Sequence, residues 1–182
     1  MDDLALARAL ATGDEAAFHT LVDREAGVIL RLCYRILGRI DEAEDAAQET
    51  FVLAYRALAS YRADGPPGAW LARIATRVCW RRSGTLSRRR AATTQLDDVL
   101  TATLAGPGDP AGDVIAAEEA TAVRRAAAML PEPYREIVAL RFFADLSMGD
   151  IAAATGRPEA TVRTQLRRGL ERLRTQMSGA KS

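Results

Sequence analysis

Arginine side chains gather near the C-terminal end of the chain, where residues 157 to 174 hold six arginines against two glutamates. The planar guanidinium of arginine donates two parallel hydrogen bonds, a geometry that fits either guanine or a phosphate group. Neither a nucleophile paired with a base nor a set of metal ligands accompanies these arginines. The segment therefore predicts non-covalent binding of DNA.

Two helices separated by a break are predicted to position these arginines, over residues 146 to 174. Ser147 can cap the first helix, and Gly156 ends it because glycine enters the left-handed region without a steric cost. Pro158 then starts the second helix, since the N–H that proline lacks would have no partner in the first helical turn. This is the pattern of a helix-turn-helix, in which the second helix enters a groove of DNA.

The second of these helices is amphipathic. Its apolar residues recur at helical spacing and are predicted to pack inward; they are Val162, Leu166, Leu170 and Leu173. The opposite face is polar and cationic and carries Thr161, Thr164, Arg167 and Arg168. A solvated basic helix in an ordinary bundle is the alternative, and it leaves the Gly-x-Pro break before the helix without a purpose.

A helix of a different kind is predicted over residues 41 to 58, with an acidic, capping-box-like start at Asp41 and Glu44. Part of this acid complements the positive end of the helix, and a solvated acidic face is the simpler interpretation. Beyond the first turn, however, a polar patch lies beside an aromatic residue. We expect this patch to dock on a basic helix of a partner, through Asp45, Gln48, Glu49 and Phe51.

The fold predicted for the whole chain is all-α, because no segment has the alternation typical of a strand. A loop is expected over residues 60 to 69, which contain two prolines and two glycines. Further helices are predicted over residues 2–12, from Asp14, over 28–37, from Trp70 to about 80, and over 114–129 and 134–143.

Two small helical domains joined by a flexible linker are expected, because a long stretch rich in Ser, Thr, Gly, Pro and Asp separates the predicted helices. The first domain spans residues 1–83, the linker 84–112 and the second domain 113–178. Net charge is only +1, but basic residues concentrate in 61–95 and 157–182 and alternate with acidic stretches. This distribution indicates two places where the chain contacts a polyanion.

Cysteine and histidine are scarce, and this excludes several classes of protein. Cys33 and Cys79 lie in apolar helical contexts, and His19 is the single histidine. Such a set predicts neither a zinc site nor a disulfide framework, so no metal, cofactor or catalytic residue is expected. No apolar run reaches the length of about 20 residues that crosses a bilayer, and the acidic start is not a signal peptide. We expect a cytoplasmic protein without membrane insertion.

Taken in order, these segments resemble the extracytoplasmic-function (ECF) group of the sigma-70 family, two-domain bacterial factors that direct RNA polymerase to promoters. The helix-turn-helix, with Asp150-Ile151-Ala152, Gly156-Arg157-Pro158 and Thr161-Val162-Arg163-Thr164, resembles region 4 of that family. Residues 41 to 58 resemble region 2.2. Tyr61-Arg62 together with Trp70-Leu71-Ala72-Arg73-Ile74-Ala75 resembles the promoter-melting region.

The resemblance implies three sets of contacts and no catalytic residue. The acidic patch would bind the clamp helices of core RNA polymerase. The second helix of the helix-turn-helix would bind the −35 element through Thr161, Arg163, Thr164, Arg167, Arg168 and Arg172. From their positions on this helix, we expect Arg168, opposite the apolar stripe, to contact base edges and Arg172, further along, to contact phosphate. The loop and the helix after it would hold the opened −10 strand, through Tyr61, Arg62, Arg73, Arg77 and Arg81.

Four residues depart from the family pattern and bear on promoter preference, namely Pro67, Arg77, Arg81 and Gln165. The resemblance also implies an anti-sigma factor as a further candidate partner. The alternative function is a helix-turn-helix regulator that binds DNA without acting as a sigma factor, and this leaves the acidic helix and the loop unexplained.

Overall fold

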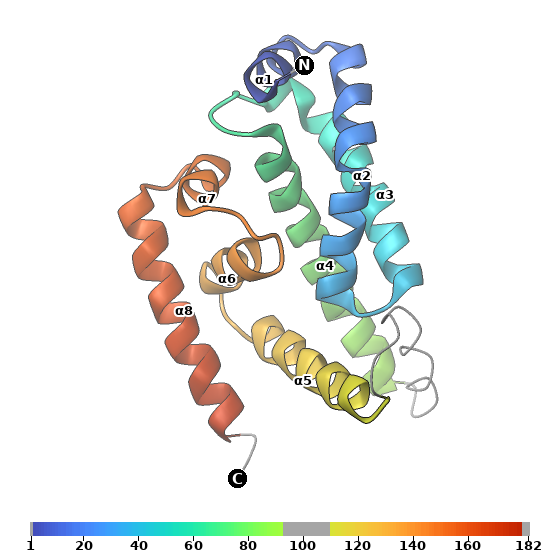
Figure 1. Cartoon of the computed structure of the whole chain (residues 1–182), viewed down its shortest axis with the longest axis vertical. Helices are drawn as coiled ribbons and strands as arrows, with labels where there is room; N and C mark the ends of the chain where they lie inside the picture. Colours follow the sequence, from blue (N-terminus) through green and yellow to red (C-terminus); the bar gives the residue numbers. More distant parts are fainter. Residues whose placement is uncertain (1, 93–109, 180–182) are drawn as a thin grey trace.

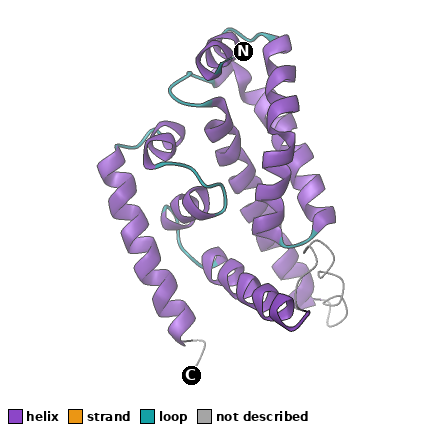
Figure 2. Cartoon of the chain, viewed as in Figure 1, coloured by secondary structure: helices purple, strands orange, loops and turns teal. Residues whose placement is uncertain are grey.

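The computed structural model describes residues 2–92 and 110–179, and every regular element in these two stretches is a helix (Figure 2). The all-α prediction is therefore confirmed. The predicted linker lies mostly outside the described residues, but its two ends are helical, because one helix runs on to Ala92 and the next begins at Pro110.

Four helices form the first half of the molecule (Figure 1). Helices α2, α3 and α4 pack on one another along their lengths, and α1 covers one end of this bundle. A short 3₁₀ helix, η1, precedes the loop that leads into α4. The bounds are α1 Asp3–Ala11, α2 Glu15–Leu37, α3 Ile40–Ala57, η1 Leu58–Ser60 and α4 Pro67–Ala92.

Four more helices form the second half, in which α6 lies between α4 and α8 (Figure 1). The predicted cap and end of the first helix of the helix-turn-helix are confirmed, and α8 begins at Glu159, one residue after the predicted Pro158. Ser147 caps α7 by accepting a hydrogen bond from Asp150 N at 3.1 Å, and Gly156 ends it in the left-handed conformation with φ of 66°. The bounds are α5 Pro110–Ala128, α6 Tyr134–Phe142, α7 Met148–Thr155 and α8 Glu159–Gly179.

The prediction of separate helices from Asp14 and over residues 28–37 is wrong, because α2 is one continuous helix of 23 residues. Gly27 stands in its middle, and a glycine there costs about 1 kcal/mol relative to alanine. That cost is smaller than the gain from burying apolar side chains on both sides of it, including Leu21 and Ile29, which are fully buried.

The predicted start of the acidic helix at Asp41 is also wrong, because α3 begins at Ile40 with Arg39 as its N-cap. Asp41 lies in the first turn and binds the Arg39 guanidinium at 2.9 Å. This hydrogen bond holds the pKa of Asp41 below its usual value. The predicted loop 60–69 is shorter than expected, because Pro67 already opens α4 in the position that suits a residue without an N–H.

One hydrophobic core extends through both halves of the described chain. Leu71 and Val78 of α4 are buried in the first half, while Ile137 of α6 and Val162 of α8 are buried in the second. Between them, the rings of Trp80 and Phe143 meet edge to face with centroids 6.3 Å apart. Helix α4 therefore contributes to the packing of both halves.

Candidate nucleic-acid interface

The inner face of α8 is fixed by burial, as its apolar spacing predicts. Val162 is fully buried and Leu166 is 8% exposed, while Leu170 and Leu173 pack against the same core. A close approach to α6 occurs at Gly169, where an added Cβ would lie 2.9 Å from Val138 Cγ2. These contacts leave α8 a single rotation about its axis, so its opposite face must point outward.

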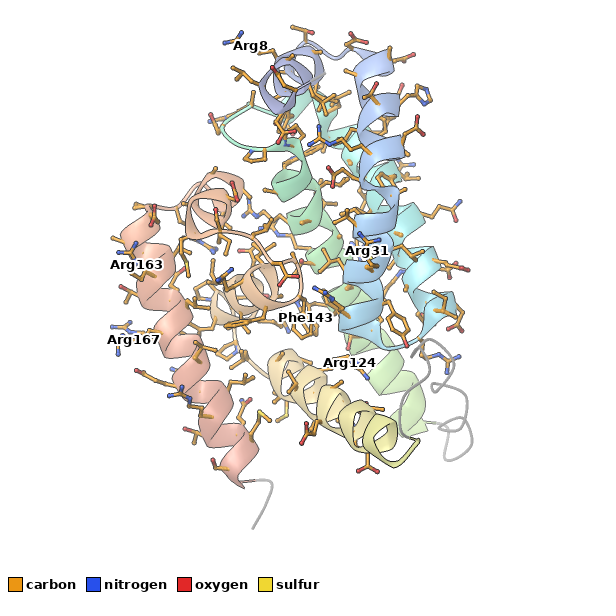
Figure 3. The ribbon with its side chains drawn as sticks, viewed as in Figure 1. Arg8, Arg31, Arg124, Phe143, Arg163 and Arg167 are labelled. Carbon is orange, nitrogen blue, oxygen red and sulfur yellow. The ribbon has the colours of Figure 1, made fainter. Side chains whose placement is uncertain are left out.

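The outer face of α8 carries the six residues predicted to contact the −35 element. All six are exposed: Thr161, Arg163, Thr164, Arg167, Arg168 and Arg172. Figure 3 shows Arg163 and Arg167 projecting from the side of α8 that faces away from the rest of the molecule. The structure therefore brings this predicted set together on one surface.

Two arginines of this face are held by glutamates one helical turn away. Arg163 pairs with Glu159 at 2.6 Å, and Arg167 pairs with Glu171 at 2.7 Å. Both guanidinium groups are about two-thirds exposed, at 70% and 66% of their side chains. Exposed pairs of this spacing contribute only about 0.3–0.5 kcal/mol, so the arginines can exchange glutamate for phosphate at little cost.

Arg172 differs from the other arginines of α8 because its guanidinium lies over the ring of Tyr134, 5.0 Å from the centroid. Such a cation–π contact stabilises an exposed arginine in one orientation by about 0.5–1 kcal/mol. The sequence did not predict this contact, because Tyr134 lies at the start of a different helix.

The acidic patch predicted on α3 is present but partly neutralised. Asp45 and Gln48 are exposed, whereas Phe51 is half-buried against the core. Glu49 accepts hydrogen bonds from Arg81 and, at 2.8 Å, from Arg82. The more exposed part of the patch is therefore Asp45 and Gln48.

Arg82 of α4 was not among the predicted site residues, yet it gathers the carboxylates of α3. Besides Glu49, its guanidinium lies 3.4 Å from Glu42 and 3.6 Å from Asp45. Burial lowers the pKa of Arg82, but the hydrogen bond and charge of Glu49 and the charges of Asp45 and Glu42 outweigh it and raise the pKa overall. The basic end of α4 and the acidic face of α3 are thus bound to each other.

The five residues predicted for the −10 strand occupy different environments. Tyr61 is 7% exposed, packs on Trp70 at 4.9 Å and donates its hydroxyl hydrogen to Gly65 O at 3.0 Å. Burial, with a smaller contribution from the nearby Asp64, raises the pKa of Tyr61 to about 12. Tyr61 therefore braces the loop, whereas Arg62 beside it is exposed.

Arg73 and Arg77 of the predicted −10 set both bind Glu136 of α6, at 3.0 and 3.1 Å. Arg157, at the turn before α8, lies 3.0 Å from the second oxygen of the same carboxylate. Sequence analysis missed Glu136, because a single glutamate in an amphipathic helix gives no signal of partners about 60 residues away.

Comparisons with known proteins identify both halves. The sigma-70 region 2 family matches residues 21–91, and the sigma-70 region 4 family matches residues 120–173. The ECF RNA polymerase sigma factor SigW of Bacillus subtilis is 33% identical over 178 residues, and the match covers 91% of each chain. This chain belongs to the ECF sigma factors.

Other sigma factors match over similar lengths. The RNA polymerase sigma-H factor of Pseudomonas aeruginosa is 35% identical over 179 residues, covering 93% of this chain and 90% of that protein. Among solved structures, CnrH in complex with the cytosolic domain of CnrY has a TM-score of 0.59 at 22% identity and covers 97% of each chain. The sigma factor RpoE bound to the anti-sigma factor NepR from Bartonella quintana has a TM-score of 0.54 at 20% identity, covering 88% of this chain and 96% of that one.

The predicted function as a sigma factor is confirmed over the regulator that would bind DNA without acting as one. In this sigma factor the region 2 match covers α3, α4 up to residue 91 and most of α2, and the region 4 match covers α6, α7, most of α8 and the second half of α5 from residue 120. Within the described stretches, no group of three or more His, Cys, Asp or Glu side chains could hold a metal ion. Among the described helices none is long and apolar enough to span a bilayer.

Proposed function

We propose that this sigma factor works in the cytoplasm as a non-catalytic subunit of RNA polymerase, with α8 on the −35 element, the loop 61–66 and α4 on the −10 element, and α3 on the polymerase. The observation that carries the proposal is the division of α8 into a buried apolar face and an outer face of threonines and arginines. The polymerase supplies the chemistry, and the sigma factor supplies the choice of promoter.

At the −35 element, Arg168 is assigned to base edges and Arg172 to phosphate. Arg168 lies opposite the buried stripe, and no ion pair holds it among the described residues. Arg172 lies one turn further along, where a helix in the major groove leaves the bases. Its contact with Tyr134 holds the guanidinium against the side of α8 that faces α6, away from the base-edge face.

At the −10 element, we assign the single strand to the region 2 wall of a cavity of about 330 Å³ that lies between the loop and α7. Arg62, Trp70 and Arg73 contribute to its wall, which combines cationic groups for phosphate with an aromatic face for a base. Tyr61 is assigned a positioning role, because its buried ring and its hydrogen bond to Gly65 hold the loop. Arg77 and Arg81 extend the cationic surface along α4.

For the polymerase, we assign docking to Asp45 and Gln48, with Glu49 held in place by Arg81 and Arg82 and Phe51 supporting the helix from beneath. Several of the structural neighbours were solved with a partner chain, and one of these partners is named as an anti-sigma factor. We propose that an anti-sigma factor is a further partner of this chain.

In vitro transcription with purified core polymerase and a promoter library tests the proposal. The full chain should direct initiation from a subset of promoters that share a −35 and a −10 sequence, and core polymerase alone should not. A chain that binds the same DNA but neither binds core polymerase nor supports initiation would contradict the proposed function.

A further inference from the structure

The carboxylate of Glu136 connects the two halves of the sigma factor. Glu136 belongs to α6 in region 4 and is 5% exposed, yet its Oε1 accepts hydrogen bonds from Arg73 Nε at 3.0 Å and Arg77 Nε at 3.1 Å. Both arginines belong to α4 in region 2. Arg157 of region 4 completes the group at 3.0 Å from Oε2.

The carboxylate at the centre of this cluster is both charged and secluded from water. Burial alone would raise the pKa of Glu136, but the hydrogen bond from Arg73 and the charges of Arg73, Arg77 and Arg157 hold it below the usual value. The carboxylate is therefore ionised at neutral pH. Charge-assisted hydrogen bonds of this kind are stronger than neutral ones, and a buried charge that loses its partners is costly.

Arg73 is engaged on both sides of its guanidinium. In addition to Glu136, it donates a hydrogen bond to Ala154 O of α7 at 2.8 Å. Its side chain is only 24% exposed, whereas that of Arg77 is 62% exposed. In this arrangement, region 4 holds Arg73 with two acceptors that occupy the place of phosphate oxygens.

Region 4 also closes the cavity assigned to the −10 strand. Ala153 and Thr155 of α7 line that cavity together with Arg62 and Trp70. The contact is tight, since a Cβ added to Gly65 would lie 2.6 Å from Ala153 Cβ. A second ion pair joins the two halves, because Arg35 of α2 reaches Asp145 of region 4 at 2.5 Å.

We propose that Glu136 is an autoinhibitory latch, which holds region 4 against region 2 and competes with the phosphates of the −10 strand for Arg73 and Arg77. DNA and the closed arrangement exclude each other, because both need the same guanidinium groups and the same cavity. Only the identity of the competitor as DNA depends on the proposed function.

The test uses two variants of the full chain that open the latch by different means. Glu136→Gln removes the charge that binds the arginines, and Ala153→Leu inserts bulk against Gly65 without changing any charge. Glu132→Gln is the control, because Glu132 precedes α6 and pairs with Arg135 of its own half. Glu132 also accepts a hydrogen bond from Glu136 N at 3.3 Å, which the side-chain oxygen of a glutamine can still accept. Circular dichroism establishes that each variant remains folded.

Small-angle scattering measures the radius of gyration, and fluorescence anisotropy measures binding of a short labelled single-stranded DNA. Both opening variants should be more extended than the wild type and should bind the DNA more tightly. A latch that keeps nine chains in ten closed would give a gain of about tenfold, because apparent affinity scales with the competent fraction. Glu132→Gln should match the wild type in both measurements, and adding Arg73→Gln to Glu136→Gln should abolish most of the gain.

An unchanged radius of gyration in both opening variants would overturn the proposal, as would a gain in DNA affinity that Glu132→Gln shows equally. If Glu136→Gln fails to fold, Ala153→Leu decides the matter alone. Failure of the proposed function would look different, because the wild type itself would then not bind core polymerase, whatever the state of the latch.

Discussion

Replacing Arg168 by alanine tests how α8 recognises the −35 element. Arg168 is exposed on the outer face, and among the described residues it has no ion-pair partner, unlike Arg163 and Arg167. Nothing has to be broken before its guanidinium contacts DNA, so the full value of a bidentate contact is available. That contact contributes about 1–3 kcal/mol, which corresponds to a roughly five- to 150-fold loss on the preferred sequence.

Arg172→Ala is the matched comparison on the same helix. Because Arg172 lies over Tyr134, we assign it to phosphate, and its removal should weaken binding to all sequences alike. The slope of affinity against salt should become shallower by about one unit. The lost contact with Tyr134 has its own effect on stability, so thermal unfolding of both variants is measured beside their activity.

Transcription from a promoter library by the wild type and the two variants decides between the two roles. Arg168→Ala should relax the preference at one or two −35 positions, and Arg172→Ala should leave the preference intact. If Arg168→Ala lowers every promoter by the same factor, then Arg168 contacts phosphate only, and the assignment of base contacts to this face of α8 is wrong.

Three further predictions concern docking, the helix break and pH. Asp45→Arg should lower the affinity for core polymerase in a pull-down, because it places like charges against a basic surface, while Asp23→Arg on the exposed face of α2 should not; equal losses would remove the patch from docking. Gly156→Ala should lower the free energy of unfolding by about 1–2 kcal/mol, because φ is 66° and an alanine is strained there, even though no atom lies within 4 Å of the added Cβ. Gly149→Ala in α7 should be tolerated, and equal thermal stability of the two variants would contradict this. The depressed pKa of Glu136 contributes stability above its unfolded pKa of about 4.3, and this is lost as the pH falls through the lower folded pKa; the difference in unfolding free energy between the wild type and Glu136→Gln should therefore shrink on acidification, and a difference that grows would show the sign to be wrong.

Local signals in the sequence predicted the helix-turn-helix well. Ser147, Gly156 and Pro158 act on their immediate neighbours, and the apolar stripe of α8 is set by helical spacing alone. The error in α2 arose from the opposite situation, because Gly27 is locally unfavourable in a helix while packing against other helices keeps α2 continuous. Burial of apolar side chains in the core determines that α2 is one continuous helix.

The ion pairs of the site could not be predicted in the same way. The partners of Glu136 on α4 lie 59 and 63 residues before it, and Arg82 binds carboxylates 33 and 40 residues before it. Charge counting identified the acidic and basic segments but not which charges meet. As a result, Arg73, Arg77 and Arg81 of the −10 set and part of the docking patch were predicted as free surfaces, whereas they are engaged within the chain.

The edge-to-face contact of Trp80 with Phe143 has a consequence for dissecting this protein into fragments. Each ring packs against the other half, and Trp80 is only 7% exposed with both halves present. A fragment that ends after α4, or one that begins at α5, would expose this apolar surface to water and should self-associate or bind a hydrophobic dye. Measurements on separated halves would then report the behaviour of this exposed apolar surface. Fragment studies will need a polar substitution at the contact to keep each fragment monomeric.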